Sequence, residues 1–266
     1  MSRALRDHFG FTAMPFDKEI GTDSLLELPT CREAMAGLRL LAETRGVGLL
    51  TGKSGTGKSC LVRKMIQELG TSLYKPMYLC HSSVGLSEFY GNLAVELGLE
   101  PKGRKATLFR AIKERLITLH RQARTHPVLI IDEAHLLANE ILADLRLLTN
   151  FEVDSSNALT VLLCGQESLA RKFDLSILEA LANSITVVVQ TTGLSKDDTM
   201  NYVEERIRSC GGQSGLFTKQ ALTLIHQASQ GVFRTIGTIA TNALLKVQVI
   251  GGSQVEAEHV QMILQR

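Results

Sequence analysis

A glycine-rich stretch between an apolar run and a helical pattern constrains the fold of this chain more than any other feature. Residues 52–59 read Gly-Lys-Ser-Gly-Thr-Gly-Lys-Ser and match the pattern G-x-x-x-x-G-K-[ST] in full. Residues 46–51 before it form a short apolar run, and residues 59–66 after it have helical spacing. A strand that turns through such a loop into a helix is typical of a parallel α/β fold.

The residue types in this loop suit the binding of an anion. Glycine permits backbone angles that other residues resist, so successive N–H groups can turn inward, and the following helix directs its positive end at the same point. In this pattern the lysine reaches the β- and γ-phosphates, and the hydroxyl after it contacts Mg²⁺. We therefore expect ATP and Mg²⁺ to bind at Gly52, Lys53, Ser54, Gly55, Thr56, Gly57, Lys58, Ser59 and Cys60. The alternative is a strand-to-helix turn that binds nothing.

A second motif lies downstream, where the apolar run 128–131 is followed by Asp132 and Glu133. In company with a phosphate loop, the first acid positions Mg²⁺ together with Ser59, and the second orients and deprotonates the attacking water. An acidic pair after an apolar run is also a common strand end. The phosphate loop earlier in the chain favours the interpretation as a hydrolytic site.

The order of apolar runs predicts the architecture. Strand-like runs occur at 47–51, 77–81, 128–132, 159–164 and 185–190, with helical stretches between them. This alternation predicts a five-stranded parallel sheet with helices on both faces. After residue 193 only helical periodicity is present, and glycine pairs follow two of the expected helices. We therefore expect three parts: an N-terminal arm and helix (1–45), an α/β core (46–193) and an all-helical domain (194–266).

Composition excludes several other classes of protein. The chain has 266 residues, of which 44% are hydrophobic and 21% charged, as is usual for a soluble globular protein. The five cysteines are dispersed without a C-x-x-C pair, which favours free thiols in a reducing compartment. No secretory leader or membrane-spanning run is visible in the sequence. We expect a cytoplasmic location.

Positive charge is concentrated in one segment. Residues 102–124 carry eight lysines and arginines and one acid, although the net charge of the whole chain is only +2. On a helix over 107–124 the apolar side chains fall on one face and most of the basic ones on the other. This pattern suits contact with DNA phosphates through Lys102, Arg104, Lys105, Thr107, Arg110, Lys113, Arg121 and Arg124. The alternative is an amphipathic helix whose solvated side happens to be basic.

Further motifs make the chain resemble one family. They are Phe9-Gly10-Phe11 with Pro15-Phe16, Leu145-Arg146-Leu147-Leu148-Thr149-Asn150-Phe151-Glu152, Leu163-Cys164-Gly165-Gln166-Glu167-Ser168-Leu169 and Gly231-Val232-Phe233-Arg234-Thr235-Ile236. With them the chain resembles, over nearly its full length, the AAA+ ATPases of the ExeA-like group. That group includes short transposition-helper ATPases of the TnsC, TniB and phage Mu B kind.

The resemblance implies roles for two further residues. Gln166, at the end of the fourth strand, corresponds to sensor 1 and would contact the attacking water or the γ-phosphate. Arg234, at the start of a C-terminal helix, corresponds to sensor 2 and would contact the γ-phosphate of ATP bound between core and lid. The group commonly has proline before that arginine, and this chain has Phe233.

A second departure from the family concerns the arginine finger that such ATPases often place just before the fifth strand. Residues 181–186 read Leu-Ala-Asn-Ser-Ile-Thr, so no arginine is present there. Either Arg171 or Lys172 replaces it, or hydrolysis is slow and the protein works mainly through ATP-bound assembly.

The resemblance implies a protein that oligomerises with ATP on double-stranded DNA, as a ring or a helical filament, and recruits or activates a transposase. A first alternative is the cytoplasmic ATPase of an ExeA-like secretion-assembly system. In such proteins the ATPase part is typically followed by further sequence, whereas this sequence ends at Arg266. Others are a metabolic kinase, which would leave the basic helix without a purpose, and a nucleotide-gated scaffold with negligible catalysis.

Overall fold

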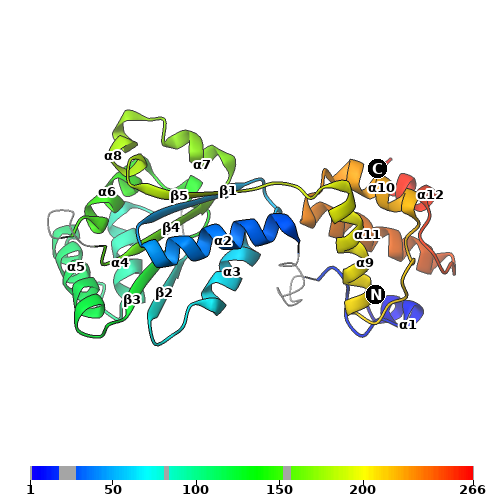
Figure 1. Ribbon diagram of the computed structural model, residues 1–266, viewed down its shortest axis with the longest axis horizontal. Coiled ribbons are helices and arrows are strands. Elements are labelled where there is room, and N and C mark those ends of the chain that lie inside the picture. The colour runs from blue at the N-terminus through cyan, green and yellow to red at the C-terminus, as the bar shows by residue number, and fades with distance from the viewer. Residues whose placement is uncertain (1, 18–27, 81–83, 152–156, 266) are drawn as a thin grey trace. The chain divides into compact units, whose positions relative to one another are not determined.

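The computed structural model describes residues 2–17, 28–80, 84–151 and 157–265 (Figure 1). Their contacts divide the chain into two compact units. The first unit comprises the described residues of 1–32, residues 55–57 and 192–265, and the second comprises 33–54 and the described residues of 58–191. Within the described residues, no helix combines the length and the hydropathy that a membrane crossing requires.

The second unit is built on a five-stranded parallel sheet, as the alternation of apolar runs predicts. Its strands are β1 (Val47–Gly52), β2 (Tyr74–Leu79), β3 (His126–Ile131), β4 (Thr160–Gly165) and β5 (Ile185–Thr191). They pair in the order β2-β3-β4-β1-β5. The three inner strands are buried along their whole length, which explains why they are continuous apolar runs without alternation. The predicted α/β fold is confirmed.

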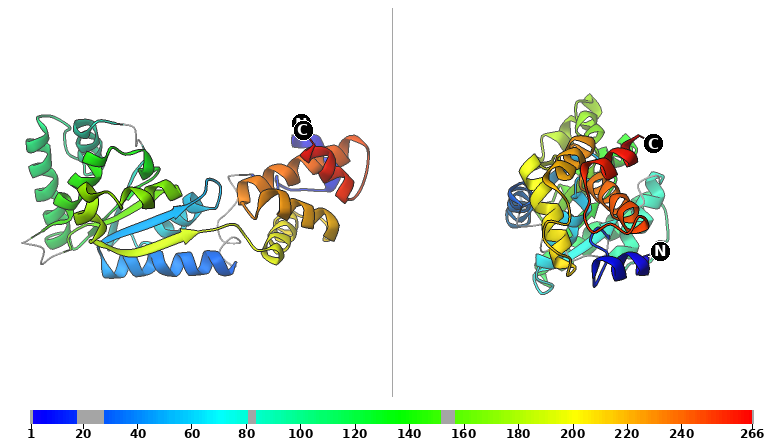
Figure 2. Two further views of the ribbon diagram at one scale, coloured as in Figure 1. Left: turned by 90° about the horizontal axis from the view of Figure 1, so that it is seen from above. Right: turned by 90° about the vertical axis from the view of Figure 1, so that its right-hand side faces the viewer.

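Helices cover both faces of this sheet (Figure 2). On one face lie α2 (Pro29–Thr44) and α3 (Lys58–Glu68); on the other lie α4 (Leu86–Glu96), α5 (Lys105–Arg121) and α6 (Asn139–Thr149). Glycine permits the close approach of α2, because a Cβ at Gly37 would lie 2.7 Å from Val189 and one at Gly48 would lie 2.3 Å from Leu41. The shorter elements η2 (Ala134–Leu136), α7 (Glu167–Lys172), η3 (Ser176–Leu178) and α8 (Glu179–Ala182) complete the unit.

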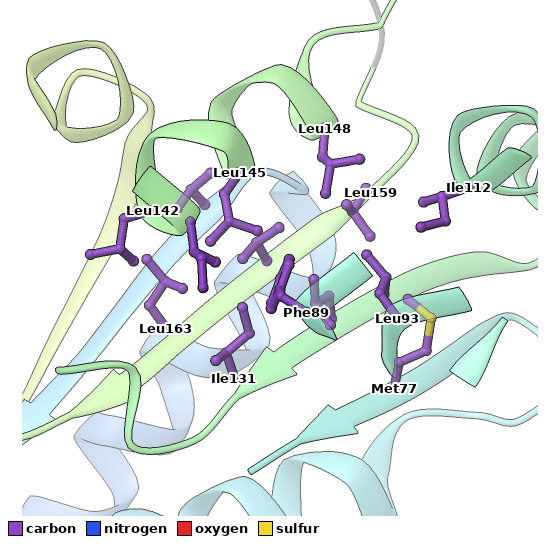
Figure 3. Packing of buried hydrophobic residues seen from close by; sticks show 14 of the residues in the cluster. Met77, Phe89, Leu93, Ile112, Ile131, Leu142, Leu145, Leu148, Leu159 and Leu163 are labelled. Carbon is purple, nitrogen blue, oxygen red and sulfur yellow. The ribbon is translucent and has the colours of Figure 1, made fainter. Parts of the chain in front are cut away.

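A hydrophobic cluster of the core lies between the sheet and helices α4, α5 and α6 (Figure 3). Met77 and Ile131 of the sheet pack there with Phe89, Leu93 and Leu145 of the helices. The apolar stripe predicted for α5 is buried, with Leu108, Ile112, Leu116 and Leu119 inside. Each such leucine contributes about 1.5–3 kcal/mol by leaving water, so this stripe fixes α5 against the sheet.

The observed boundaries differ most from the predicted ones at two strands and one helix. Strands β2 and β3 begin three and two residues earlier than their apolar runs, and each early segment contains a proline, Pro76 or Pro127. Proline lacks an N–H, but β2 is an edge strand and Pro127 lies near the start of its strand, where a donor is least needed. Helix α5 ends at Arg121, so Arg124 lies beyond it with a φ of 52°.

The first unit is helical, as predicted for the C-terminal part. It contains α9 (Lys196–Ser209), α10 (Lys219–Ser229), α11 (Phe233–Val249) and α12 (Ala257–Leu264). Side chains cap two of these helices: the Ser195 hydroxyl accepts the N–H of Asp198, and the Thr218 hydroxyl accepts that of Ala221. A helix that the sequence did not predict, α1 (Ser2–Phe9), packs against α11.

The residues after α1 are held to α9 by a buried arginine. The Nε of Arg206 donates to the Pro15 carbonyl at 2.7 Å, and its guanidinium lies 5.9 Å from the Tyr202 ring centroid. That tyrosine also packs against Phe16 and Phe233. The N-terminal motif therefore has a structural role within the first unit.

Candidate nucleotide site and basic segment

Three neighbouring strands end at the same edge of the sheet and bring the expected site residues together. β3, β4 and β1 lie side by side, with Ile131 paired to Leu163 and Gly165 paired to Thr51. Asp132 and Glu133 follow β3, and Gln166 follows β4. The phosphate loop begins at the last residue of β1. Parallel strands place their carboxyl ends on one side, and ligands of open α/β sheets bind there.

The phosphate loop has the backbone conformation that its glycines allow. Gly55 and Gly57 have φ angles of 84° and 92°, and α3 begins at Lys58. The ammonium of Lys58 is buried and donates to the carbonyls of Gly52 at 2.8 Å and Lys53 at 2.9 Å. The lysine is thus held within the loop, where a phosphate would meet it.

The two acids after β3 have different surroundings. Asp132 is buried, and its carboxylate accepts the Tyr78 hydroxyl at 2.7 Å and the N–H of Glu133 at 2.9 Å. Glu133 has a left-handed backbone with φ 53°, and its side chain is 49% exposed. A fixed carboxylate suits a metal-positioning role, and a water-accessible one suits a base.

Tyr78 is a residue of this site that the sequence analysis did not identify. Its ring is 41% exposed, and its hydroxyl reaches Asp132 from the neighbouring edge strand. Burial of the hydroxyl, followed by its hydrogen bond to Asp132, raises the pKa of Tyr78 above its ordinary value. The phenol therefore remains a donor to the carboxylate. The only sequence signal is its position near the end of β2, which pairs with β3.

The buried thiol of Cys164, at the end of β4, lies near the charged groups of the nucleotide motifs. Burial raises the pKa of Cys164 well above its ordinary value, and the charges of Asp132, Lys58 and Glu133 all act on it. A group at the end of β4 thus interacts with the loop lysine and with both acids. His135 is also near, with its Nδ1 3.3 Å from a carboxylate oxygen of Glu133 but without hydrogen-bond geometry.

The donor set fits a nucleotide with Mg²⁺. Mg²⁺ is usually held by one or two protein oxygens together with phosphate oxygens and water, not by a cage of side chains. The described residues contain no cluster of three or more His, Cys, Asp or Glu side chains that could hold a metal unaided. Asp132 and the exposed Ser59 at the start of α3 are the residues that could hold the ion beside a bound triphosphate.

The residues expected as sensors lie in different units. Gln166 is exposed at the start of α7, in the unit that holds Lys58 and both acids. Arg234 is exposed at the start of α11 and belongs to the first unit, where its N–H donates to the Gly55 carbonyl at 3.3 Å. Lys172 is one of the two residues considered as a replacement for the arginine finger. Its ammonium donates to the Leu137 carbonyl of the same unit at 2.6 Å.

Two lysines of the basic segment contact α6, and Lys102, although exposed, forms an ion pair with Glu100 at 2.8 Å. Lys105 forms an ion pair with Asp144, and Lys113 donates to the carbonyls of Leu147 and Asn150 at the end of α6. The expectation that Lys113 lies on the solvated face of α5 is wrong, because it closes the end of a neighbouring helix. Six expected contact residues are exposed: Lys102, Arg104, Thr107, Arg110, Arg121 and Arg124.

Two of the family motifs fall on elements at opposite edges of the sheet, and only the motif around Gln166 lies beside the nucleotide motifs. Residues 145–151 cover the end of α6 and the residues after it, and Glu152 lies outside the described residues. The motif around Gln166 covers the end of β4 and the start of α7.

The fold is similar to that of several solved structures. The Aeropyrum pernix ORC2 protein in ADPNP–ADP complexes superposes with a TM-score of 0.70 at 15% identity, over 96% of this chain and 72% of that one. The Aeropyrum pernix ORC1 protein in complex with DNA gives 0.64 at 18% identity, over 86% and 64%. At these identities the likeness shows the fold alone.

The sequence also matches a curated protein and a family pattern. General secretion pathway protein A of Aeromonas hydrophila is 32% identical over 251 residues, which are 93% of this chain and 45% of that protein. The chain thus spans less than half of that relative's length, and the match supports the resemblance to the ExeA-like group. The AAA domain pattern matches residues 41–173, half of the chain. The chain therefore belongs to the AAA domain family, and ATP hydrolysis is the activity that this membership supports.

Proposed function

We propose that this protein is an ATP-dependent, DNA-binding AAA+ regulator of transposition, which assembles on duplex DNA and recruits or activates a transposase. The observation that carries the proposal is the combination of a phosphate loop, a buried acid and an exposed acid at one sheet edge with an exposed basic segment on the same unit. The first part supplies nucleotide chemistry, and the second supplies contact with a polyanion.

In the nucleotide site each residue has a separate task. Lys58 and the N–H groups of 52–60 bind the triphosphate, and Ser59 and Asp132 would hold Mg²⁺, which neutralises charge on the phosphate oxygens. Tyr78 fixes the orientation of the Asp132 carboxylate through its 2.7 Å hydrogen bond. Glu133 takes a proton from the attacking water. Gln166 and Arg234 would sense the γ-phosphate.

DNA contact falls to the exposed side chains Lys102, Arg104, Arg110, Arg121 and Arg124. None of the described residues in the segment combines exposure with an aromatic ring suited to reading bases, so we expect contact with phosphates without strong sequence preference. Fold relatives include a protein solved with DNA, which supports the plausibility of this role. ATP binding would favour an oligomer on duplex DNA, and hydrolysis would release it.

The role in transposition is the most specific part of the proposal, and it rests on the resemblance to transposition-helper ATPases. A second candidate is the ATPase part of a secretion-assembly system, which the match to general secretion pathway protein A favours. The two roles differ in what the basic segment does, because a secretion ATPase has no need to bind duplex DNA.

The test is negative-stain microscopy of the protein on duplex DNA with a slowly hydrolysed ATP analogue, with ADP and without nucleotide. We expect rings or filaments on DNA only with the analogue. A variant in which Lys102 and Arg104 are changed to Gln tests the basic segment. It should retain the fold but form no assemblies on DNA. Absence of DNA-bound assemblies under all three conditions would favour the secretion role.

A further inference from the structure

A polar cavity lies at the opposite edge of the sheet from the nucleotide site. It has a volume of about 330 Å³ and is lined by residues that precede β1, β4 and β5 and by residues of α6 and α8. The carboxyl ends of the strands hold the nucleotide motifs, so this cavity at their amino ends is a separate site. Two of its lining residues, Arg45 and Arg146, come from segments far apart in the sequence.

The lining carries positive charge and hydrogen-bond donors, with no carboxylate among the lining residues described. Besides the two arginines it includes Asn157 and Asn183, and the hydroxyls of Thr149 and Ser184. The guanidinium group presents a planar fork of N–H donors that matches an oxygen anion in bidentate fashion. Such a lining fits a phosphate group and disfavours a cation.

The backbone at Arg45 adds a second, independent observation. Arg45 follows α2 with a φ of 57°, a left-handed conformation that glycine adopts at the least cost. Asn157, another residue of the lining, donates to the Arg45 carbonyl at 3.3 Å and holds this conformation. An arginine in a position that favours glycine is explained if its side chain is required in the cavity.

Further positive charge surrounds the same edge. Arg121 ends α5 and Arg124 lies between it and β3, and both are exposed. Burial, followed by the charge of Arg45, lowers the pKa of His126 to about 3, and burial with Arg45 and Arg121 lowers that of His120. The two histidines are therefore neutral near pH 7 and add no positive charge to that of the arginines.

We propose that this cavity is a phosphate site in which Arg45 and Arg146 bind a backbone phosphate of duplex DNA. The inference deepens the proposed function and rests on it. It adds to the exposed arginines of α5 two residues that the sequence analysis did not connect with DNA. Arg121 and Arg124, which precede β3 at the same edge of the sheet, supply further cations that favour a polyanion over a single small anion.

One arm of the test measures phosphate binding without DNA. It uses the full chain with Lys58→Ala, so that the phosphate loop does not contribute, and follows the Tm with increasing inorganic phosphate. Arg45→Gln combined with Arg146→Gln should lose the phosphate-dependent rise in Tm. The control, Lys219→Gln combined with Lys246→Gln, removes the same charge from two exposed lysines of the first unit and should keep the rise.

The second arm measures duplex DNA affinity of the chain with its phosphate loop intact, in the presence of a slowly hydrolysed ATP analogue. The arginine pair should bind about tenfold more weakly than the lysine control, as expected for a lost charged hydrogen bond. Its plot of log affinity against log salt should be shallower by about 0.9. Arg45→Lys with Arg146→Lys keeps the charge and should retain part of the affinity if the fold is intact.

Loss of the phosphate response together with about tenfold weaker DNA binding in the arginine pair would support the proposal. An unchanged phosphate response and unchanged DNA affinity in the arginine pair would overturn it. A lost phosphate response with unchanged DNA affinity would overturn DNA as the occupant and assign the cavity to free phosphate or to a nucleotide of another copy. If the unmodified chain binds no duplex, the proposed function fails, and the phosphate arm alone then decides whether the cavity is an anion site.

Discussion

Two acids that are neighbours in the sequence have different environments in the structure. Asp132 is only 7% exposed and accepts two hydrogen bonds. The Glu133 side chain is 49% exposed, and the backbone of this residue is in the left-handed conformation. Their order in the sequence predicted separate roles, and their burial now gives a physical reason for the separation. A base must reach water, and a metal-positioning acid must keep its orientation.

We predict that Glu133→Gln binds ATP but turns it over at least about 100-fold more slowly, because a general base contributes about 10²–10⁴. Phosphate release measures the rate, and a fluorescent nucleotide measures the affinity. Lys58→Ala is the control and should lose nucleotide affinity itself. Turnover of Glu133→Gln at the unmodified rate would contradict the assignment of the base.

We predict that Tyr78→Phe raises the Mg²⁺ concentration needed for half-maximal turnover by about 10-fold, since groups that orient a metal ligand typically contribute 10–100-fold. The ring is retained, so packing should change little. Titration of turnover with Mg²⁺ gives the answer. Tyr74→Phe is the matched control, because the Tyr74 hydroxyl contacts the Ala42 carbonyl, not an acid. Equal Mg²⁺ dependence in both variants would remove Tyr78 from the site.

The sequence could indicate which residues the structure brings together at the carboxyl edge of the sheet, because the loop pattern encodes a backbone geometry and a set of donors at fixed spacing. It could not predict Tyr78, whose partner lies on the neighbouring strand, or the pairing of Arg45 with Arg146 at one cavity. These contacts depend on strand order, and strand order is not contained in any local pattern.

At the scale of elements, α5 shows that a basic helix face need not have one purpose. Leu108, Ile112, Leu116 and Leu119 fix the helix, as their spacing predicts. Lys113, one turn from Arg110, binds carbonyls at the end of α6, and its ammonium lies 4.8 Å from the centroid of the Phe151 ring. Burial lowers the pKa of Lys113.

We predict that Lys113→Gln lowers the free energy of unfolding by about 1 kcal/mol, as for a lost partly solvated hydrogen bond, and leaves DNA affinity nearly unchanged. Arg110→Gln should do the reverse. Urea unfolding and fluorescence anisotropy of a duplex measure the two effects. A loss of DNA affinity in Lys113→Gln as large as that in Arg110→Gln would contradict this division of α5.

We predict that acid destabilises the second unit through His126 at the start of β3. Its pKa in the folded state is about 3, below the unfolded value, so the unfolded chain takes up a proton that the folded chain does not. Stability is therefore present above about pH 6.5 and declines as the pH falls, by up to about 1.4 kcal/mol per pH unit. His126→Gln, which can still contact Thr160, should show a smaller decline between about pH 7 and pH 5 in urea unfolding. An identical decline in both proteins would assign it to other groups.

Element type was predictable where apolar spacing was strong, as in the inner strands and α9 to α11. Strands β2 and β3 begin earlier than predicted. Their first residues include a proline, which in a sequence usually indicates the end of a strand but is tolerated in an edge strand or at a strand start. Helix α1 was not predicted because Ser2–Phe9 has little apolar content and is fixed by its packing against α11.

At the scale of the whole molecule, three surfaces carry the proposed activities. The carboxyl edge of the sheet carries the nucleotide motifs, α5 and the residues before it carry exposed cations, and the amino edge carries the arginine-lined cavity. Membership of the AAA domain family supports the first. The other two are proposals, and both depend on whether nucleotide controls DNA binding.

The measurement that tests this most directly is the affinity of Glu133→Gln for a short duplex in ATP, compared with its affinity in ADP and with that of Lys58→Ala in ATP. We predict tight, salt-dependent binding only for Glu133→Gln in ATP, because this variant keeps the triphosphate while Lys58→Ala cannot hold it. Equal affinity in all three samples, or none in any of them, would contradict the claim that ATP drives assembly on DNA.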